Sequence, residues 1–231
     1  MARRAIAVLS LGLLAALPAT VGASSLELRI GGFVPRADSN LFRDDSDLYT
    51  VSKKDWAGVY GGAEFSFTPS DHVELGIHLD GYGRRVDTNY RDYTRPGGGE
   101  ILQSLKLTLV PLGATLRLFP TDRDATVAPY VGVGPDLVFY KYEEFGDFID
   151  FADPELTIRA DDFVSEGVRP GLHVTGGLRV RVGHDFSILG EGRYQWAKAT
   201  LGDDFSPQPG QDALRLDMSG FSAVVGLSIR F

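Results

Sequence analysis

The chain has 231 residues, a formal net charge of −8 and no cysteine. An acidic chain argues against nucleic acid as a partner, because phosphate binding needs clustered Lys and Arg. The lack of cysteine excludes a disulfide framework and a thiolate metal site, so packing and hydrogen bonds must hold the fold.

The first residues have the layout of a secretory signal peptide. Two arginines precede an apolar run over residues 5–16, and small residues follow as far as Ala23. The run is shorter than the ~20 residues that a helix needs to span a bilayer, so a retained anchor is the weaker interpretation. We expect cleavage after Ala23, which would divide the chain into a signal peptide, 1–23, and a mature domain, 24–231, with a net charge of −10.

Alternation of apolar with polar or small residues recurs along the rest of the chain, which is the period-two signal of β-strands. The eight segments with this pattern are 26–34, 59–67, 73–79, 105–118, 127–137, 172–180, 186–196 and 221–231. In the fourth segment the apolar positions shift by one residue at Val110–Pro111. We expect a β-bulge there, because proline cannot donate to the ladder. With this shift, Leu105, Leu107 and Leu109 would lie on the apolar face of the strand.

The connections between these segments alternate between short and long. The short ones are centred on turn-forming residues and cover 68–72, 119–126 and 182–185, whereas the long ones run roughly over 36–55, 85–99, 143–169 and 198–212. Long loops at one end and tight turns at the other are typical of outer-membrane barrels, whose turns lie in the periplasm. The pattern therefore predicts one barrel domain with both termini at the turn end.

The charges divide between the two faces of the strands. One face has none, and the other has six acids and eight bases. The acids are Glu27, Glu64, Glu74, Asp80, Asp136 and Glu191, and the bases are Arg29, Arg84, Lys106, Arg117, Arg179, Arg181, Arg193 and Arg230. A cation at the bilayer midplane costs such a barrel ~2–4 kcal/mol, so lipid would enforce a charge-free outer face. Alternation alone would equally suit a soluble, lipocalin-like barrel with its apolar face inside.

Two further features favour lipid on the outside. Aromatic residues of the apolar face gather near the strand ends, as an interfacial girdle requires. They are Phe65, Phe67, Phe186 and Phe231 at the turn end, and Phe139, Tyr194 and Trp196 at the loop end. The same face carries several glycines, which fill a dry core poorly but allow a barrel to curve.

The last strand, GFSAVVGLSIRF, ends on Phe231, with Gly226 and Ile229 before it. This ending resembles the C-terminal insertion signal of bacterial outer-membrane barrels. The whole mature chain, from SLELRIGGFVP through VPLGATLRLFP, APYVGVG and EGRYQWA, resembles the small outer-membrane β-barrel domain family, broadly the OmpW, OmpX and opacity-protein group. The resemblance implies an eight-stranded antiparallel up-and-down transmembrane barrel that the outer-membrane assembly machinery inserts, with the terminal strand closing on the first.

The interior of an eight-stranded barrel is just wide enough for its side chains to fill, so we expect no open aqueous pore. Unpaired buried charges are costly, and we therefore expect Glu64, Glu74 and Asp80 to pair across the lumen with Arg117, Arg179 and Arg193, leaving Lys106 as a further lumen charge. The sequence favours a structural or surface-interaction role with a plugged lumen. The alternatives are passage or binding of small apolar molecules, which the OmpW resemblance implies, and a soluble periplasmic ligand-binding barrel.

Few residues indicate chemistry. His72 and His184 fall in turns, and His78 and His173 point inward, with no Ser-His-acid grouping at a known spacing. Acidic loop clusters lack the spaced ligands and glycine of a calcium loop. We therefore predict no catalytic residue, cofactor or metal, and no enzymatic activity. The expected location is the cell outer membrane, with lipid, lipopolysaccharide and the assembly machinery as partners, and the expected state is a monomer.

Overall fold

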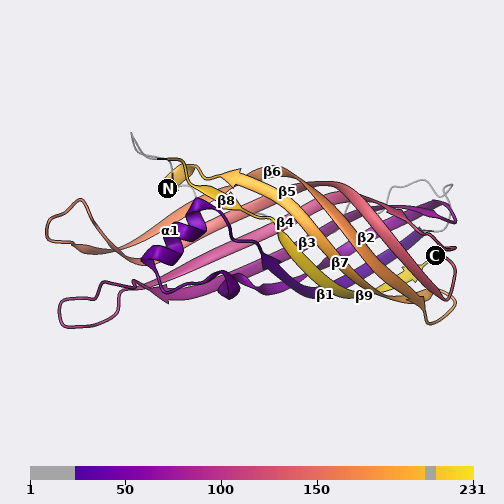
Figure 1. Cartoon of the computed structure of the whole chain (residues 1–231), viewed down its shortest axis with the longest axis horizontal. Helices are drawn as coiled ribbons and strands as arrows, with labels where there is room; N and C mark the ends of the chain where they lie inside the picture. The colour runs from indigo at the N-terminus through magenta and orange to yellow at the C-terminus, as the bar shows by residue number, and fades with distance from the viewer. Residues whose placement is uncertain (1–23, 206–211) are drawn as a thin grey trace.

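The computed structural model describes residues 24–205 and 212–231, so the predicted signal peptide and its cleavage after Ala23 lie outside the described residues. Its strands form a closed antiparallel ring (Figure 1). The ring consists of β1 (Ser24–Pro35), β2 (Gly58–Ser70), β3 (Val73–Asn89), β4 (Leu102–Leu118), β5 (Val127–Ile149), β6 (Ile158–Arg181), β7 (Phe186–Thr200) and β9 (Gly220–Arg230). Each strand pairs with its neighbour in this order, and β9 pairs with β1. The predicted eight-stranded barrel is confirmed.

The connections at the loop end contain the remaining elements. They are α1 (Asn40–Leu48), the 3-10 helices η1 (Lys53–Trp56) and η2 (Asp203–Phe205), and the short strand β8 (Arg215–Asp217), which pairs with β7 outside the ring. In Figure 1, α1 lies at the end of the barrel opposite the C-terminus, where two long hairpins also project. No helix in the described part of the chain is both long and apolar enough to span a bilayer.

The last strand closes the ring against the first. Gly226 lies opposite Arg29 and Ile229 opposite Leu26. At the end of this pair, the Phe231 N–H donates to the Ser24 carbonyl at 3.0 Å. This pairing is the closure that the family resemblance implied. The use of Gly226, Ile229 and Phe231 as an insertion signal stays a prediction.

The outer face of the ring is an exposed apolar belt. Large aliphatic side chains are half exposed or more on opposite walls, for example Ile30 at 62%, Val59 at 68% and Leu172 at 58%. A soluble barrel would bury this face, because a contiguous apolar surface of this extent is unfavourable in water. The interpretation as a soluble periplasmic barrel is therefore wrong, and the apolar face meets lipid.

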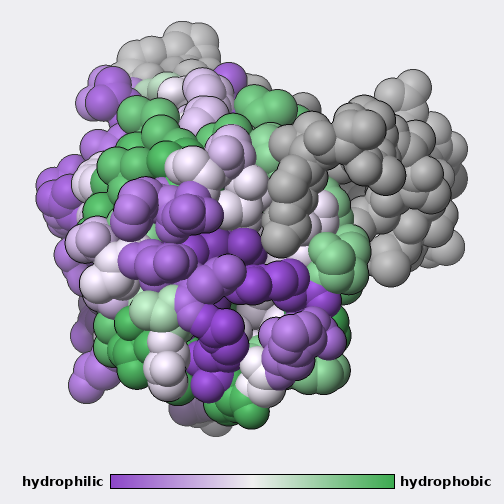
Figure 2. Space-filling view, turned by 90° about the vertical axis from the view of Figure 1, so that its right-hand side faces the viewer, coloured by the Kyte–Doolittle hydropathy of each residue, from purple (hydrophilic) through white to green (hydrophobic). Residues whose placement is uncertain are grey.

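Aromatic side chains mark both borders of the belt. At the turn end the rings of Phe65 and Phe231 are 6.2 Å apart, and at the loop end those of Tyr194 and Trp196 are 4.7 Å apart. Figure 2 looks onto the turn end, where a hydrophilic patch is bordered by hydrophobic residues. The borders suit two membrane interfaces.

The predicted β-bulge is wrong. Strand β4 keeps one register with β5 across Val110–Pro111, since Leu109 lies opposite Tyr140 and Leu112 opposite Leu137. The alternation of faces is therefore unbroken along β4. Leu105, Leu107 and Leu109 point inward and are at most 1% exposed, because the loop half of the lumen is itself apolar.

The same unbroken alternation corrects the placement of Lys106. This side chain is 44% exposed on the outside of the barrel, where its Nζ lies 3.0 Å from the Glu143 carboxylate. In register it lies opposite Arg85 on β3, another exposed charge. These charges lie beyond the apolar belt, so the membrane-spanning part of β3, β4 and β5 ends on the turn side of them.

Two of the long loops are shorter than predicted. Strand β5 continues to Ile149 and β6 begins at Ile158, so most of the expected loop 143–169 is a hairpin that projects beyond the barrel (Figure 1). The expected loop 85–99 likewise begins with strand, as far as Asn89. In the β5–β6 hairpin, charged residues lie on both faces, for example Glu143 and Glu144, which removes the apolar alternation by which a strand is recognised.

Candidate functional site in the barrel interior

The loop half of the interior is an apolar core. The barrel wall contributes side chains such as Phe33, Tyr82 and Leu107, and the loops contribute Leu41 of α1 and Trp56 of η1. Trp56 is 1% exposed. The long connection after β1 therefore folds back over the mouth and packs into it.

The turn half of the interior holds a charged cluster that we call the lumen network. It has equal numbers of buried acids and arginines, which are Glu27, Glu64, Glu74, Asp80 and Glu191 with Arg29, Arg117, Arg123, Arg179 and Arg193. Each acid contacts at least two of the arginines. The network is neutral as a whole, which offsets much of the cost of burying ten charges.

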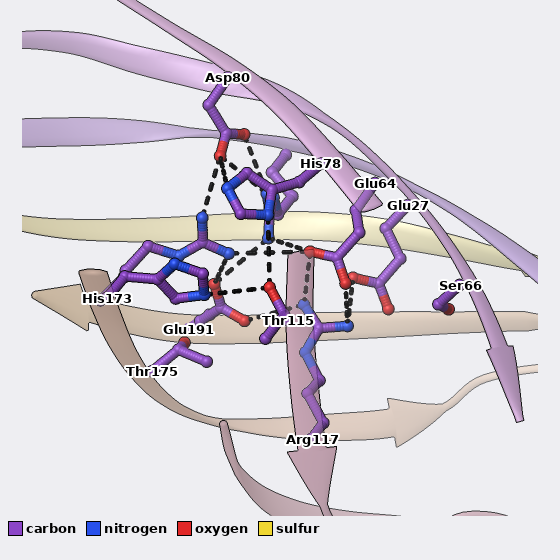
Figure 3. Close-up of polar contacts among 12 residues, drawn as sticks. Glu27, Glu64, Ser66, His78, Asp80, Thr115, Arg117, His173, Thr175 and Glu191 are labelled. Carbon is purple, nitrogen blue, oxygen red and sulfur yellow. Dashed lines mark hydrogen bonds and ion pairs between the residues drawn. The ribbon is translucent and has the colours of Figure 1, made fainter. Parts of the chain in front are cut away.

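Arg117 joins four acids of the lumen network, and Figure 3 shows its guanidinium next to Glu64 and Glu27. Its side chain is fully buried, with Nη1 3.2 Å from Glu27 and 2.9 Å from Glu74. Its Nη2 lies 3.0 Å from Glu64 and 3.1 Å from Glu191. One guanidinium thus joins acids from four strands, as its forked donors allow.

The other arginines extend the network in both directions. Toward the loops, Arg29 donates two hydrogen bonds of 2.9 Å to Asp80. Toward the turns, Arg123 Nε lies 2.7 Å from Glu74. Two tyrosines, Tyr60 and Tyr130, donate further hydrogen bonds of 2.9 Å to Asp80 and Glu191.

Sequence reasoning placed most of these residues but not all. Nine charges predicted on the inner face lie in the network, namely Glu27, Glu64, Glu74, Asp80, Glu191, Arg29, Arg117, Arg179 and Arg193. Arg123 was missed because it lies in a turn, where alternation gives no signal. Four predicted inner-face bases lie outside the network: Lys106 points outward, Arg84 is exposed at the loop end, and Arg181 and Arg230 lie at the turn end, where Arg230 pairs with Asp124.

The lumen network leaves little free space at the turn end. A depression lined by Arg123, Arg179 and Arg230 among others has a volume of about 10 Å³. A water molecule needs at least this much room. With the apolar core at the other end, the described residues close the lumen from both sides.

A second buried cluster lies beside the network and holds two histidines. Asp136 accepts from His173 Nδ1 at 3.0 Å, and its Oδ1 lies 3.1 Å from His78 Nε2. Thr115 Oγ1 lies between the rings (Figure 3), 3.3 Å from His78 Nδ1 and 3.1 Å from His173 Nε2. We call these four residues the histidine cluster. Sequence reasoning put His78, Asp136 and His173 on the inner face but did not bring them together.

A groove of about 950 Å³ opens on the lipid-facing wall next to the histidine cluster. Its lining is largely apolar and includes Leu112, Pro135, Pro170 and Trp196, together with Asp136. The pairing of β4 with β5 is interrupted opposite Pro135, because proline has no N–H to donate. No alternation signal could have found this groove, since it depends on which residues of five strands lie at one level.

A third cluster lies above the membrane belt, where α1 meets β5. The Tyr142 hydroxyl is 2.9 Å from a carboxyl oxygen of Asp45 and 2.9 Å from one of Glu144. Burial raises the pKa of Glu144 to about 7, and burial together with the nearby Glu144 raises the pKa of Asp45 well above its usual range. We call Asp45 and Glu144 the carboxyl pair of the mouth.

Comparison with known proteins finds similarity in structure and not in sequence. No family model and no curated protein matches the chain. Neisserial surface protein A matches with a TM-score of 0.50 and 14% identity, covering 91% of this chain and 97% of that chain. OprG, an outer membrane protein from Pseudomonas aeruginosa, matches with a TM-score of 0.52 and 11% identity over the same shares. The E. coli outer membrane protein W aligns over 92% of this chain and 100% of that one, with a TM-score of 0.40 and 15% identity.

The first two likenesses show that this chain has the fold of the small outer-membrane β-barrels. They confirm the predicted fold class and the structural side of the family resemblance. The uncharged, exposed apolar belt is the surface that such a fold presents to lipid. The chain therefore has the fold of the small outer-membrane β-barrels and an outer surface that suits lipid.

Proposed function

We propose that the protein is a closed barrel that anchors its loop end at the cell surface, with a structural or surface-interaction role. One observation carries this proposal: the lumen is filled by the network of buried ion pairs in its turn half and by an apolar core in its loop half. An ion crossing it would have to break contacts of Arg117, whose side chain is fully buried among four carboxylates. The cost of separating buried pairs makes steady conduction unfavourable.

The loop end supports a surface role, because the described helices and the long hairpins of the protein lie there (Figure 1). Helix α1 and the β5–β6 hairpin project above the belt (Figure 1), and loops on a rigid scaffold are where binding residues usually lie. The partners that we propose within the membrane are lipid, lipopolysaccharide and the assembly machinery, with the protein as a monomer.

Conductance in planar bilayers tests the closed lumen. We expect no steady unit conductance from the purified, folded protein at neutral pH. A general porin added afterwards to the same bilayer is the control that the membrane reports open pores. Reproducible unit steps from the protein alone would contradict the proposal.

A second function, binding of small apolar molecules, is favoured by the lipid-facing groove. Its volume of about 950 Å³ suits a small ligand, and its position gives access from the bilayer without passage through the lumen. Trp196 lines the groove and is 46% exposed. The proposed ligand therefore reaches the protein from the membrane.

Fluorescence of Trp196 tests this binding, in a Trp56→Phe background that leaves it as the single tryptophan of the chain. We expect a brominated alkane to quench it with saturation, at a lower concentration than it quenches a tryptophan elsewhere on the belt. The matched control moves the reporter by combining Trp56→Phe and Trp196→Phe with Leu227→Trp, since Leu227 is 40% exposed on the belt of β9. Equal, non-saturating quenching in the two proteins would show simple partitioning into lipid.

A further inference from the structure

The histidine cluster is assembled by four neighbouring strands. His78 lies on β3, Thr115 on β4, Asp136 on β5 and His173 on β6. One ligand atom each from His78, Asp136 and His173 lies within 4.8 Å of the others, and all three residues are buried. Tetrahedral Zn²⁺ with bonds of about 2.0–2.1 Å places its ligand atoms about 3.3 Å apart. The contacts of 3.0 and 3.1 Å to Asp136 are close to that spacing.

Charge gives an independent reason to expect a cation. The lumen network balances its five acids with five arginines, but Asp136 has no arginine contact among the described residues. Its charged or chargeable partners are the two imidazoles. A buried carboxylate without a cation is costly, so Asp136 needs a positive charge at this position.

The position of Thr115 indicates which nitrogen of each imidazole carries the hydrogen. If both histidines are neutral and donate to Asp136, then His78 Nδ1 and His173 Nε2 are both acceptors that face Thr115 Oγ1. A hydroxyl has one hydrogen and can serve only one of them. If the nitrogens near Asp136 bind a metal, the far nitrogens carry the hydrogens, and the hydroxyl oxygen can accept from both. Such an outer partner is usual for metal-bound histidine.

The backbone leaves room for this arrangement at Gly113. It lies between His78 and Asp136 in register, and a Cβ there would lie 2.1 Å from the Asp136 carboxylate and 2.7 Å from His78 Cε1. Any other residue would push the two side chains out of place. The glycine thus lets the ligands converge.

We propose that His78, Asp136 and His173 bind a divalent first-row transition-metal ion, Zn²⁺ in the first instance, with Thr115 orienting the two rings. Two imidazoles and one carboxylate are a donor set that suits Zn²⁺ and neighbouring ions. The ion supplies the charge that Asp136 lacks and links β3, β5 and β6 across β4. The site adjoins the lumen network, and Asp136 also lines the groove, but neither proposed function depends on a bound ion.

Binding of Co²⁺ to the folded, untagged, chelator-treated protein tests the site, because Co²⁺ at low coordination number absorbs in the visible range. We expect one Co²⁺ per chain, displaced by one equivalent of Zn²⁺. The His78→Gln and His173→Gln variants should lose at least tenfold in affinity. The control His184→Gln should bind like the wild type, since the His184 side chain is 99% exposed in a turn.

Two measurements keep the test decisive if a ligand variant does not fold. Thr115→Val should weaken binding by about 10–100-fold, as loss of an outer partner does, whereas Thr115→Ser should restore it. X-ray absorption of the Zn²⁺-loaded wild type should show two imidazoles and a carboxylate. The proposal is overturned if the folded wild type binds no stoichiometric metal, which would leave a protonated histidine as the partner of Asp136. It is equally overturned if binding persists in both glutamine variants.

Discussion

Replacing Arg117 with methionine is expected to lower the free energy of unfolding of the barrel by about 3–5 kcal/mol, the range for removing one partner of a buried ion pair. Methionine fills much of the space but leaves five buried acids with four arginines. The affected carboxylates, Glu27, Glu64, Glu74 and Glu191, are each within 3.2 Å of the guanidinium. Urea unfolding in phospholipid vesicles, followed by tryptophan fluorescence, measures the change.

The control for this prediction is an arginine in an exposed pair. Arg36 contacts Asp38 at 2.9 Å, and its side chain is 54% exposed. Arg36→Met should therefore have a much smaller effect, because solvent screens such pairs. If electrostatic imbalance is the cause, adding Glu64→Gln to Arg117→Met should recover part of the loss, as interacting sites do in a double-mutant cycle. A loss equal to the sum of the two single effects would contradict this explanation.

The positions of the strands could be predicted because lipid imposes a simple rule on one face. Ile30 and Leu172 must be apolar where they meet the bilayer, so alternation shows through the belt region of β1 and β6. Inside the barrel no such uniform rule holds. Leu107 and Arg117 lie on the same inner face of β4, one in an apolar core and the other in an ion-pair network. A shift from apolar to charged within one face imitates a shift of register, which explains the false bulge and the misplaced Lys106.

The histidine cluster could not be predicted for a different reason. The sequence indicates that His78 and Asp136 point inward, but not how far each strand is displaced along its neighbour. Their contact depends on the register that places both opposite Gly113. Register in a closed barrel is fixed by the stagger of all its strands together. Similarly, α1 folds into the mouth through Leu41 and Phe42, and a helix this short has a weak signal of its own.

The docking of α1 on the barrel mouth is expected to weaken as the pH rises toward and past 7. Tyr142 has one hydroxyl hydrogen but lies 2.9 Å from both Asp45 and Glu144. The second contact therefore needs a protonated carboxyl as its donor. The pKa of Glu144 is raised to about 7 by burial, and that of Asp45 is raised by burial and by the Glu144 charge.

The sign of the effect follows from proton linkage. A carboxyl whose pKa is higher in the docked state binds more protons there than when it is free, so docking is favoured at low pH. For Glu144 this contribution is complete below about 4.5, the ordinary value, and is lost as the pH rises through about 7. Once both carboxyls have lost their protons, they are charged, buried and close to one another, and their repulsion pushes α1 from the mouth.

Hydrogen exchange of the α1 amides measures this opening. After correction for intrinsic exchange, protection over residues 40–48 should fall by up to about tenfold per pH unit between pH 5 and 8 for each proton released. The double variant Asp45→Asn with Glu144→Gln should remove this dependence, because neither side chain can then take up a proton on docking, whereas Asp45→Asn alone leaves the part that burial of Glu144 contributes. The matched control is Glu143→Gln, which changes the residue next to Glu144 but on the outer face. Partial burial raises the pKa of Glu143, but Lys141 and Lys106 outweigh it, so this pKa is lowered overall. If that variant also loses the pH dependence, the carboxyl pair of the mouth is not its source.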